Sequence, residues 1–441
     1  MEKTSIAADL HLHGRFSRAT SKDITVSSLE KYAKIKGIGL LGTGDFTHPK
    51  WLSELKAGLK EDGTGFLKSK TGFPFVLQTE VANIFSQDGK LRKVHNIILA
   101  KNFGIVDQIN EHLSKKGNLS ADGRPIFGKY SCIQLVEDMM KISKEIEIIP
   151  AHVYTPWFSI FGSMSGFDSV EECFQDKAHY IHALETGLSS DPEMNWRISK
   201  LDRYTLISNS DSHSFWPWRM GRECNLLEIE PSYAGLLNAI RTKKGFKMTI
   251  EVDPGYGKYH FDGHRNCNVC LKPSDSLKNK NICPKCGKSL TIGVLHRVEE
   301  LADRPEGYKP KNAVEFKRII PLHEILAASI GAGIATQKTW DIYNKLVGGL
   351  GNEMNILLNA TEKELTQHSN EKLAALIIKN RNGEIEILPG YDGEYGRPII
   401  SKKEEKKQDL KALREATEIE GESISARKKK SEAQMGLKKF F

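Results

Sequence analysis

Short apolar runs alternate with helical segments along the first half of the chain. Residues 5–13 alternate apolar and polar side chains, which is the period of a half-buried strand. Residues 133–142 repeat apolar side chains at helical spacing, and Ser27 or Ser28 can cap an earlier helix that Gly37 ends. Further strands are expected at residues 38–42, 75–81, 95–100, 147–151, 180–185 and 204–208. The alternation predicts an α/β fold with parallel strands, arranged as a closed barrel or as an open sheet.

The pattern changes after about residue 250. Residues 255–263 are rich in Gly, Tyr and Asp and mark a boundary, after which a cysteine-containing segment follows. Residues 321–350 predict two short helices broken at 331–333, and 352–358 predict a third. Beyond residue 401 nearly every side chain is charged or polar, as in a flexible tail. The expected division is 1–250, 255–320, 321–400, 401–433 and 434–441.

The charge of the chain is concentrated in two segments. The net charge is +8, and residues 255–320 carry 13 basic against 7 acidic side chains, while 401–441 carry 12 against 8. The remainder is nearly neutral, which suits an enzyme body with basic attachments for a polyanion. The longest apolar stretch, 325–335, is shorter than the roughly 20 residues that cross a bilayer. Because the first residues also lack an apolar signal core, we expect a cytoplasmic protein without membrane contact.

Metal-binding side chains gather at the ends of the predicted strands. His11 and His13 stand two residues apart on one strand and therefore point to one face. In a βα barrel the C-terminal strand ends share a face, where active sites are built; only His95 begins its strand instead. Any one such histidine is more often a hydrogen-bonded core residue, but nine candidates favour a metal centre. They are His11, His13, Asp45, His48, Glu80, His95, His152, Asp211 and His213.

In this order and context, these residues resemble the PHP family of metal-dependent phosphoesterases. The resemblance covers about residues 5–240 and implies a distorted (β/α)7 barrel with a trinuclear metal centre. Many relatives have adjacent Asp and His where this chain has Asp45 and His48, two residues further apart. The resemblance implies ions held by His11, His13, Glu80 and Asp211, by Glu80, His95 and His152, and by His213 with the Asp45–His48 segment.

Four cysteines form two C-x-x-C pairs with twelve residues between them. Four thiolates at this spacing match a zinc ribbon, so a structural zinc ion is expected in a module spanning 255–320. A site closed by four thiolates leaves no open position for chemistry. The module either holds a small domain together or, given its basic surplus, contacts nucleic acid. The four ligands are Cys267, Cys270, Cys283 and Cys286.

The segment 434–441 resembles the sliding-clamp (PCNA) interaction motif, in which a glutamine precedes an aliphatic and two aromatic residues that enter a groove. Its matching residues are Gln434, Leu437, Phe440 and Phe441. Together with the barrel, the four-cysteine module and the helical segment, it resembles the endonuclease Q family of DNA repair nucleases. This resemblance implies cleavage of DNA on the 5′ side of hypoxanthine, uracil, xanthine or an abasic site, leaving a 3′-hydroxyl and a 5′-phosphate. It also implies damaged DNA and PCNA as partners of a replication-associated monomer.

The chemistry expected of such an enzyme is multi-metal hydrolysis of a phosphodiester. Asp211, Glu80 and His213 are the expected catalytic residues, with Zn²⁺, Mg²⁺ or Mn²⁺ in the centre. A deaminated base must be read outside the stack, where hydroxyl or guanidinium donors favour its new carbonyl. Two alternatives remain open: a small-molecule phosphatase of the histidinol-phosphate type, and a non-catalytic clamp-bound DNA adaptor. The residues expected to contact the substrate base are Glu185, Ser189, Trp218 and Arg222.

Overall fold

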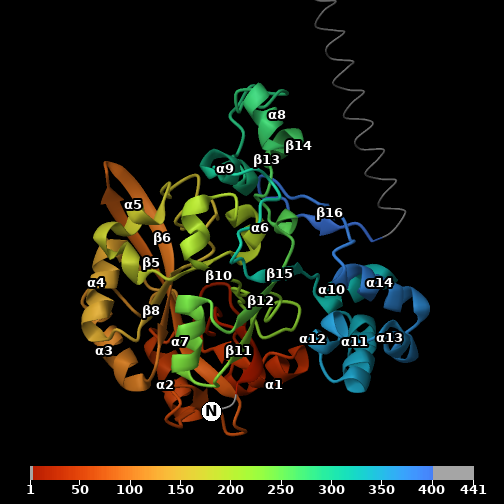
Figure 1. Ribbon diagram of the computed structural model, residues 1–441, viewed down its shortest axis with the longest axis horizontal. Coiled ribbons are helices and arrows are strands. Elements are labelled where there is room, and N and C mark those ends of the chain that lie inside the picture. The colour runs from red at the N-terminus through yellow and green to blue at the C-terminus, as the bar shows by residue number, and fades with distance from the viewer. Residues whose placement is uncertain (1–2, 401–441) are drawn as a thin grey trace, which may run out of the picture. The chain divides into compact units, whose positions relative to one another are not determined.

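The computed structural model describes residues 3–400 of the chain (Figure 1). Of these, residues 3–397 belong to one compact unit. The described residues have a mixed α/β fold dominated by one sheet of eleven strands. Within residues 3–400, no helix combines the length and the apolar character needed to cross a membrane.

The large sheet runs in the order β15-β12-β11-β1-β2-β5-β4-β3, while β6 and β7 pair with β5, and β8 pairs with β6. A separate sheet holds the parallel strands β9 (Ala183–Glu185) and β10 (Thr205–Ile207). The strands of the large sheet are β1 Thr4–Asp9, β2 Leu40–Gly42, β3 Lys60–Glu61, β4 Leu67–Lys68, β5 Pro74–Gln87, β6 Lys90–Ala100, β7 Ile126–Gly128, β8 Glu147–Pro150, β11 Cys224–Ile229, β12 Phe246–Glu251 and β15 Glu315–Arg318.

The prediction of parallel strands is wrong for several neighbours. β1 and β2 are parallel, but β1–β11, β11–β12, β5–β6 and β6–β8 are antiparallel. β5 and β6 form one long hairpin whose turn residues Asp88 and Gly89 have φ of 53° and 71°. An Asp-Gly pair favours this tight turn because both central residues need positive φ. His95 therefore lies within β6, opposite Ala82, rather than at the start of a strand.

Backbone hydrogen bonds join the C-terminal ends of strands from both sheets. The amide of Val153, after β8, donates to the carbonyl of Glu185 at the end of β9, at 3.0 Å. The amide of His13, after β1, donates to the carbonyl of Ser212, after β10, also at 3.0 Å. These bonds bring the ends of four strands to one rim, where the predicted metal ligands lie.

Local signals explain where the helices begin and end. Thr25, not Ser27 or Ser28, caps α1: its hydroxyl accepts from the Ser28 amide at 3.0 Å, and the Ser28 hydroxyl accepts from the Thr25 amide at 2.8 Å. Gly37 ends α1 with φ of 95°, as predicted. The helices of the first half are α1 Val26–Lys36, α2 Pro49–Gly58, α3 Phe103–Ser114, α4 Cys132–Ile142, α5 Val170–Phe174, α6 Pro192–Asn195 and α7 Tyr233–Thr242.

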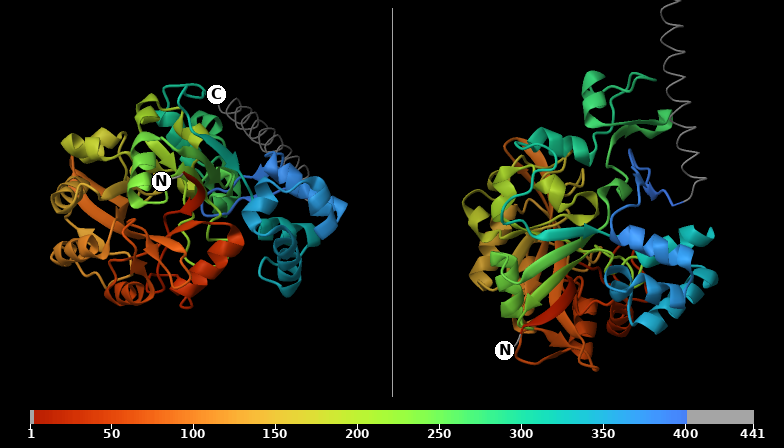
Figure 2. Two further views of the ribbon diagram at one scale, coloured as in Figure 1. Left: turned by 60° about the horizontal axis from the view of Figure 1, so that its bottom comes forward. Right: turned by 45° about the vertical axis from the view of Figure 1, so that its right-hand side comes forward.

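The second half holds a small cysteine-containing segment and a group of helices, α10–α14, that pack on one another (Figure 2). The break between α10 and α11 confirms the predicted pair of helices. The Lys36 ammonium of α1 donates to Glu353 Oε1 of α12 at 2.6 Å and ties this group to the first half. The elements are β13 Asp262–His264, β14 Val269–Leu271, α8 Pro273–Lys278, α9 Val294–Leu301, α10 Leu322–Ile330, α11 Gln337–Leu350, α12 Glu353–Leu358, α13 Glu362–His368, α14 Glu371–Arg381, β16 Ile387–Leu388 and β17 Arg397–Pro398.

Candidate metal centre

Six of the nine predicted ligands form two groups of three, and within each group one potential ligand atom from each residue lies within 4.8 Å of the other two. Glu80 lies on β5. One of its carboxylate oxygens faces His95 and His152, and the other faces His13. Imidazoles and carboxylates in such groups suit divalent transition metals. The first group is His11, His13 and Asp211, and the second is Glu80, His95 and His152.

Glu80 connects the two groups. Its Oε1 lies 2.7 Å from His95 Nδ1 and 3.1 Å from His152 Nε2. Its Oε2 lies 3.5 Å from His13 Nε2, which is itself 3.0 Å from Asp211 Oδ1. A carboxylate placed this way has the geometry to bridge two ions.

A carboxylate behind the centre orients His11. Glu185 Oε1 lies 3.0 Å from His11 Nδ1, and the same side chain accepts from the His152 amide at 2.8 Å and from Asn209 Nδ2 at 2.9 Å. This contact turns the other ring nitrogen of His11 toward Asp211 Oδ1, at 3.7 Å. Nε2 of His11 is buried without a hydrogen-bond partner, as expected of a metal-coordinating nitrogen.

The other three predicted ligands lie beside the two groups. Asp45 Oδ1 is 3.1 Å from His13 Nδ1, so this carboxylate supports His13 from behind. His213 stacks obliquely on His13 with ring centroids 4.4 Å apart. The His48 ring is stacked on Phe16, and its buried Nδ1 has no hydrogen-bond partner.

Three residues of the centre have a strained backbone. Asp45, His152 and Asp211 have φ of 28°, 31° and 46°, in the left-handed region that ordinary side chains avoid. Such conformations persist where the surrounding structure imposes them, and they cluster at functional sites. Here they turn carboxylate and imidazole groups inward from the ends of their strands.

Burial and neighbouring charges shift the pKa values of the candidate ligands. Burial disfavours the charged form of His11, but Glu185, Asp211 and Glu80 outweigh it and raise its pKa to about 9. Burial dominates at His95 and lowers its pKa to about 4. Burial raises the pKa of Glu80, but its contacts with His95, Arg124 and His152 outweigh burial and hold that pKa well below the usual range. The site therefore offers an ionised carboxylate beside a neutral imidazole.

Arg124 is a residue of the centre that the sequence did not reveal. Arg124 stands in the loop that precedes β7, and its Nη1 donates to Glu80 Oε2 at 2.9 Å. No periodic pattern or motif marks this arginine, because it stands in an irregular segment of mixed polarity.

A cavity of about 270 Å³ opens beside the centre, and His152 and Asp211 form part of its wall. Gly187 permits the close approach, since a Cβ at this position would lie 2.7 Å from the Cβ of His152. Burial lowers the pKa of His260 on the same wall to about 4, and its buried Nδ1 has no hydrogen-bond partner. The other lining residues are Thr155, Pro156, Trp157, Leu188, Ser189, Pro254, Gly257, Lys258, Tyr259, Val294 and Tyr395.

Of the residues expected to read a base, only Ser189 lines this cavity. Glu185 is fully buried behind His11. Trp218 is buried and stacks on Trp216 with centroids 5.2 Å apart. Arg222 donates from Nη2 to the main-chain carbonyl of Ser210 at 3.1 Å, and Ser210 is the residue before Asp211.

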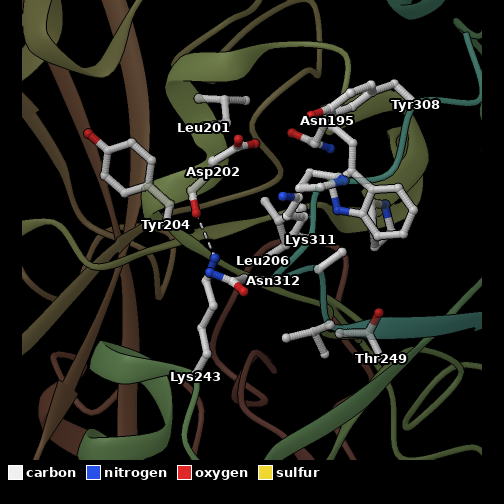
Figure 3. A pocket seen from close by; sticks show the side chains of 15 residues that line it. Asn195, Leu201, Asp202, Tyr204, Leu206, Lys243, Thr249, Tyr308, Lys311 and Asn312 are labelled. Atoms are coloured by element: carbon white, nitrogen blue, oxygen red, sulfur yellow. Dashed lines mark hydrogen bonds between the residues drawn. The ribbon is translucent and has the colours of Figure 1, made fainter.

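A second cavity of about 300 Å³ lies elsewhere, between α6, β10, β12 and the segment before β15 (Figure 3). Lys243 reaches into it and donates from Nζ to the main-chain oxygen of Asp202 at 2.7 Å. Arg304 donates two hydrogen bonds to the carboxylate of Asp202, from Nη1 at 2.8 Å and from Nη2 at 2.6 Å. None of the nine candidate metal ligands lines this second cavity, so the metal-side cavity is the better candidate for a reaction site.

The cysteine segment brings a histidine to its thiols. His264 Nδ1 lies 3.4 Å from Cys286 Sγ, and the ligand atoms of His264, Cys267, Cys283 and Cys286 lie within 4.8 Å of one another. Cys270 lies opposite Gly263 in the β13–β14 pair. The histidine was not expected, because it precedes the first C-x-x-C pair. The clamp-motif residues Gln434, Leu437, Phe440 and Phe441 lie outside the described residues.

Comparison with known proteins finds similarity along nearly all of the chain. A family described as the MJ0043 C-terminal domain matches residues 321–384. The uncharacterized protein MJ0043 of Methanocaldococcus jannaschii is 38% identical over 250 residues, 55% of this chain but only 31% of that relative. The uncharacterized protein YqxK of Bacillus subtilis is 30% identical over 412 residues, 89% of this chain and 98% of that protein.

Two solved structures are similar at TM-scores of 0.81 and 30% identity. One is the lesion-specific endonuclease PfuEndoQ from Pyrococcus furiosus, matched over 91% of this chain and 96% of that chain. The other is endonuclease Q in complex with a 27-mer duplex substrate that has an abasic lesion at the active site, matched over 91% and 98%. The similarity therefore includes the segments beyond the large sheet.

Proposed function

This chain belongs to the endonuclease Q family, and from that premise we propose that it is a DNA repair endonuclease that hydrolyses the phosphodiester on the 5′ side of a damaged nucleotide. The observation that carries the proposal is the pair of ligand groups joined by Glu80, with a cavity beside them. The products are a 3′-hydroxyl and a 5′-phosphate, and the substrates are hypoxanthine, uracil, xanthine and abasic sites in DNA.

The donor set and the unpartnered His11 Nε2 fit divalent ions. Bound there, Zn²⁺, Mg²⁺ or Mn²⁺ supplies positive charge to the phosphoryl transition state and lowers the pKa of a water molecule. The protein holds the ligands in place: Glu185 orients His11, and Asp45 orients His13. Asp211 is the carboxylate that we assign to orienting the attacking water, because its side chain is 28% exposed while Glu80 is fully buried.

The cavity beside the centre is proposed to receive the damaged base outside the DNA stack. Deamination replaces an amino donor by a carbonyl acceptor, so hydrogen-bond donors on the wall select the damaged base. Ser189 offers a hydroxyl, and His260, neutral at pH 7, places its imidazole on the same wall. Trp157 and Tyr259 meet edge to face at 5.6 Å and supply aromatic surface for the base.

The remaining parts of the chain support this reaction. We assign residues 1–250 to a distorted (β/α)7 barrel of the PHP type, 255–320 to a structural zinc module and 321–400 to a helical domain. Basic side chains of the module make it a candidate DNA contact. The segment 434–441 is proposed to bind the PCNA clamp, which brings the enzyme to replicating DNA. A clamp pull-down with Phe440→Ala and Phe441→Ala tests this assignment separately from activity.

The test of the proposed function uses end-labelled duplex DNA with a single hypoxanthine. Asp211→Asn is compared with the wild type and with Asp107→Asn, a control at an exposed ion pair with Lys56. The proposal expects one nick on the 5′ side of the lesion from the wild type and the control, and none from Asp211→Asn. Phosphate release from a small phosphomonoester without any nick supports a phosphatase instead, and binding without turnover supports a DNA adaptor.

A further inference from the structure

We propose that Arg124 binds a non-bridging oxygen of the scissile phosphodiester while it holds Glu80. This inference rests on the proposed function, because it names a substrate contact of the same site. It adds a substrate-binding arginine to a centre otherwise made of carboxylates and imidazoles.

The fold places Arg124 at the centre by fixing both of its neighbours. The carbonyl of Pro125 accepts from the Ala82 amide at 3.0 Å, and β7 then pairs with β5 from Ala82 onward. On the other side, Gly123 packs so closely on Ser17 that a Cβ there would collide with it. Ser17 in turn donates its hydroxyl to Asp45, beside His13. The arginine is thus held between β5, which carries Glu80, and the loop that follows His11 and His13.

One terminal nitrogen of the guanidinium is unused. Nη1 donates to Glu80 Oε2 at 2.9 Å and Nε is buried, whereas Nη2 makes no hydrogen bond to any residue that the structure describes. The side chain is 26% exposed, so a substrate can reach part of it. Nη2 can therefore donate to one oxygen of a phosphate, with the full charge of the guanidinium behind the contact.

The position suits a phosphate that occupies the centre. Glu80 Oε2 lies 2.9 Å from Arg124 Nη1 and 3.5 Å from His13 Nε2, so one carboxylate oxygen separates the arginine from the first ligand group. A phosphodiester that enters this space brings a negative charge next to a guanidinium already fixed in place. A fixed donor in a desolvated site typically accelerates the reaction about 100- to 1000-fold.

The alternative role is support of Glu80 alone, and two measurements separate the roles. Arg124→Gln and Arg124→Lys are compared with the wild type and with Arg203→Gln, a control at an exposed pair with Glu171. Metal content by mass spectrometry reports on Glu80, and single-turnover cleavage of hypoxanthine DNA reports on the phosphate contact. We expect metal content unchanged in all variants, a rate about 100-fold lower in Arg124→Gln, and partial recovery in Arg124→Lys.

A stereospecific substitution in the DNA tests the contact directly. Sulfur replaces each non-bridging oxygen of the scissile phosphate in turn. One of the two isomers should slow the wild type without rescue by a thiophilic metal, and this penalty should shrink in Arg124→Gln, which has already lost the contact. Equal penalties in both proteins, or a rate loss that follows lost metal and recovers with excess metal, would overturn the inference.

The two proposals fail in different ways. A wild type that never cleaves damaged DNA overturns the proposed function and this inference together. A wild type that cleaves beside an equally active Arg124→Gln overturns the inference alone.

Discussion

Glu185 Oε1 lies 3.0 Å from Nδ1 of His11, on a carboxylate that is fully buried. The same carboxylate accepts hydrogen bonds from the amide of His152 and from Asn209, so one side chain supports a ligand of each metal group. Glu185 therefore acts as a positioning residue for the centre in this account.

Replacing Glu185 by Gln should weaken metal binding about 10- to 100-fold, because the amide offers one acceptor where three donors converge. Metal affinity measured by competition with a chelator checks this. Glu171→Gln, at an exposed position, serves as the matched control. Unchanged affinity in Glu185→Gln would show that His11 is oriented by other contacts.

Replacing Gly187 by Ala should displace His152 and weaken metal binding about tenfold. Gly187 has φ of 62°, and the new Cβ would lie 2.7 Å from the His152 Cβ. Gly89→Ala is the matched control, because Gly89 also has positive φ but a Cβ there meets no atom within 4 Å. Both variants should lose about 1–2 kcal/mol of stability in thermal unfolding from the backbone conformation. Metal affinity that falls equally in both would contradict the assignment.

Metal binding should release protons at pH 7. The pKa of His11 is raised to about 9, so its imidazole is protonated in the metal-free protein and must lose that proton to bind an ion. Apparent metal affinity should therefore rise with pH up to about 9. The same shift stabilises the metal-free fold fully below pH 6.5, and this contribution is lost as the pH rises through 9. Calorimetric titrations in two buffers of different ionisation enthalpy measure the released protons; equal heats would refute the prediction.

Replacing His260 by Phe should slow cleavage at hypoxanthine about tenfold or more while leaving cleavage at an abasic site nearly unchanged. An abasic site has no base to accept a hydrogen bond, so only the hypoxanthine substrate loses a contact. Rates on both substrates measured side by side check this, and the abasic substrate serves as the internal control. An equal loss on both substrates would mean that His260 supports the fold of the cavity and does not read the base.

Several candidate ligands could be predicted because they follow strands in the sequence. The spacing of His11 and His13 suggested one shared face, although both residues follow β1, and Asp211 follows β10. Glu80 and His95 lie within β5 and β6 instead of at a strand end. The Asp88-Gly89 pair is a sequence signal for the long β5–β6 hairpin, because such a pair favours a tight turn between antiparallel strands.

The sequence did not show the roles that other residues have at the site. Glu185 contacts His11 although the two residues are 174 positions apart in the sequence. Whether its side chain faces the cavity or His11 depends on the tertiary structure. Arg124 stands in an irregular loop whose position depends on the pairing of β7 with β5. Likewise, His264 joins the thiols through the antiparallel pair β13–β14, outside the C-x-x-C spacing.

The most direct test of the central claim is a single-turnover cleavage of hypoxanthine DNA in water enriched in heavy oxygen, with mass spectrometry of both fragments. Hydrolysis at the metal centre predicts that the lesion-containing fragment carries a 5′-phosphate with one heavy oxygen, and that the other fragment ends in an unlabelled 3′-hydroxyl. A phosphate left on the 3′ end, or a 5′-phosphate without the label, would contradict the account.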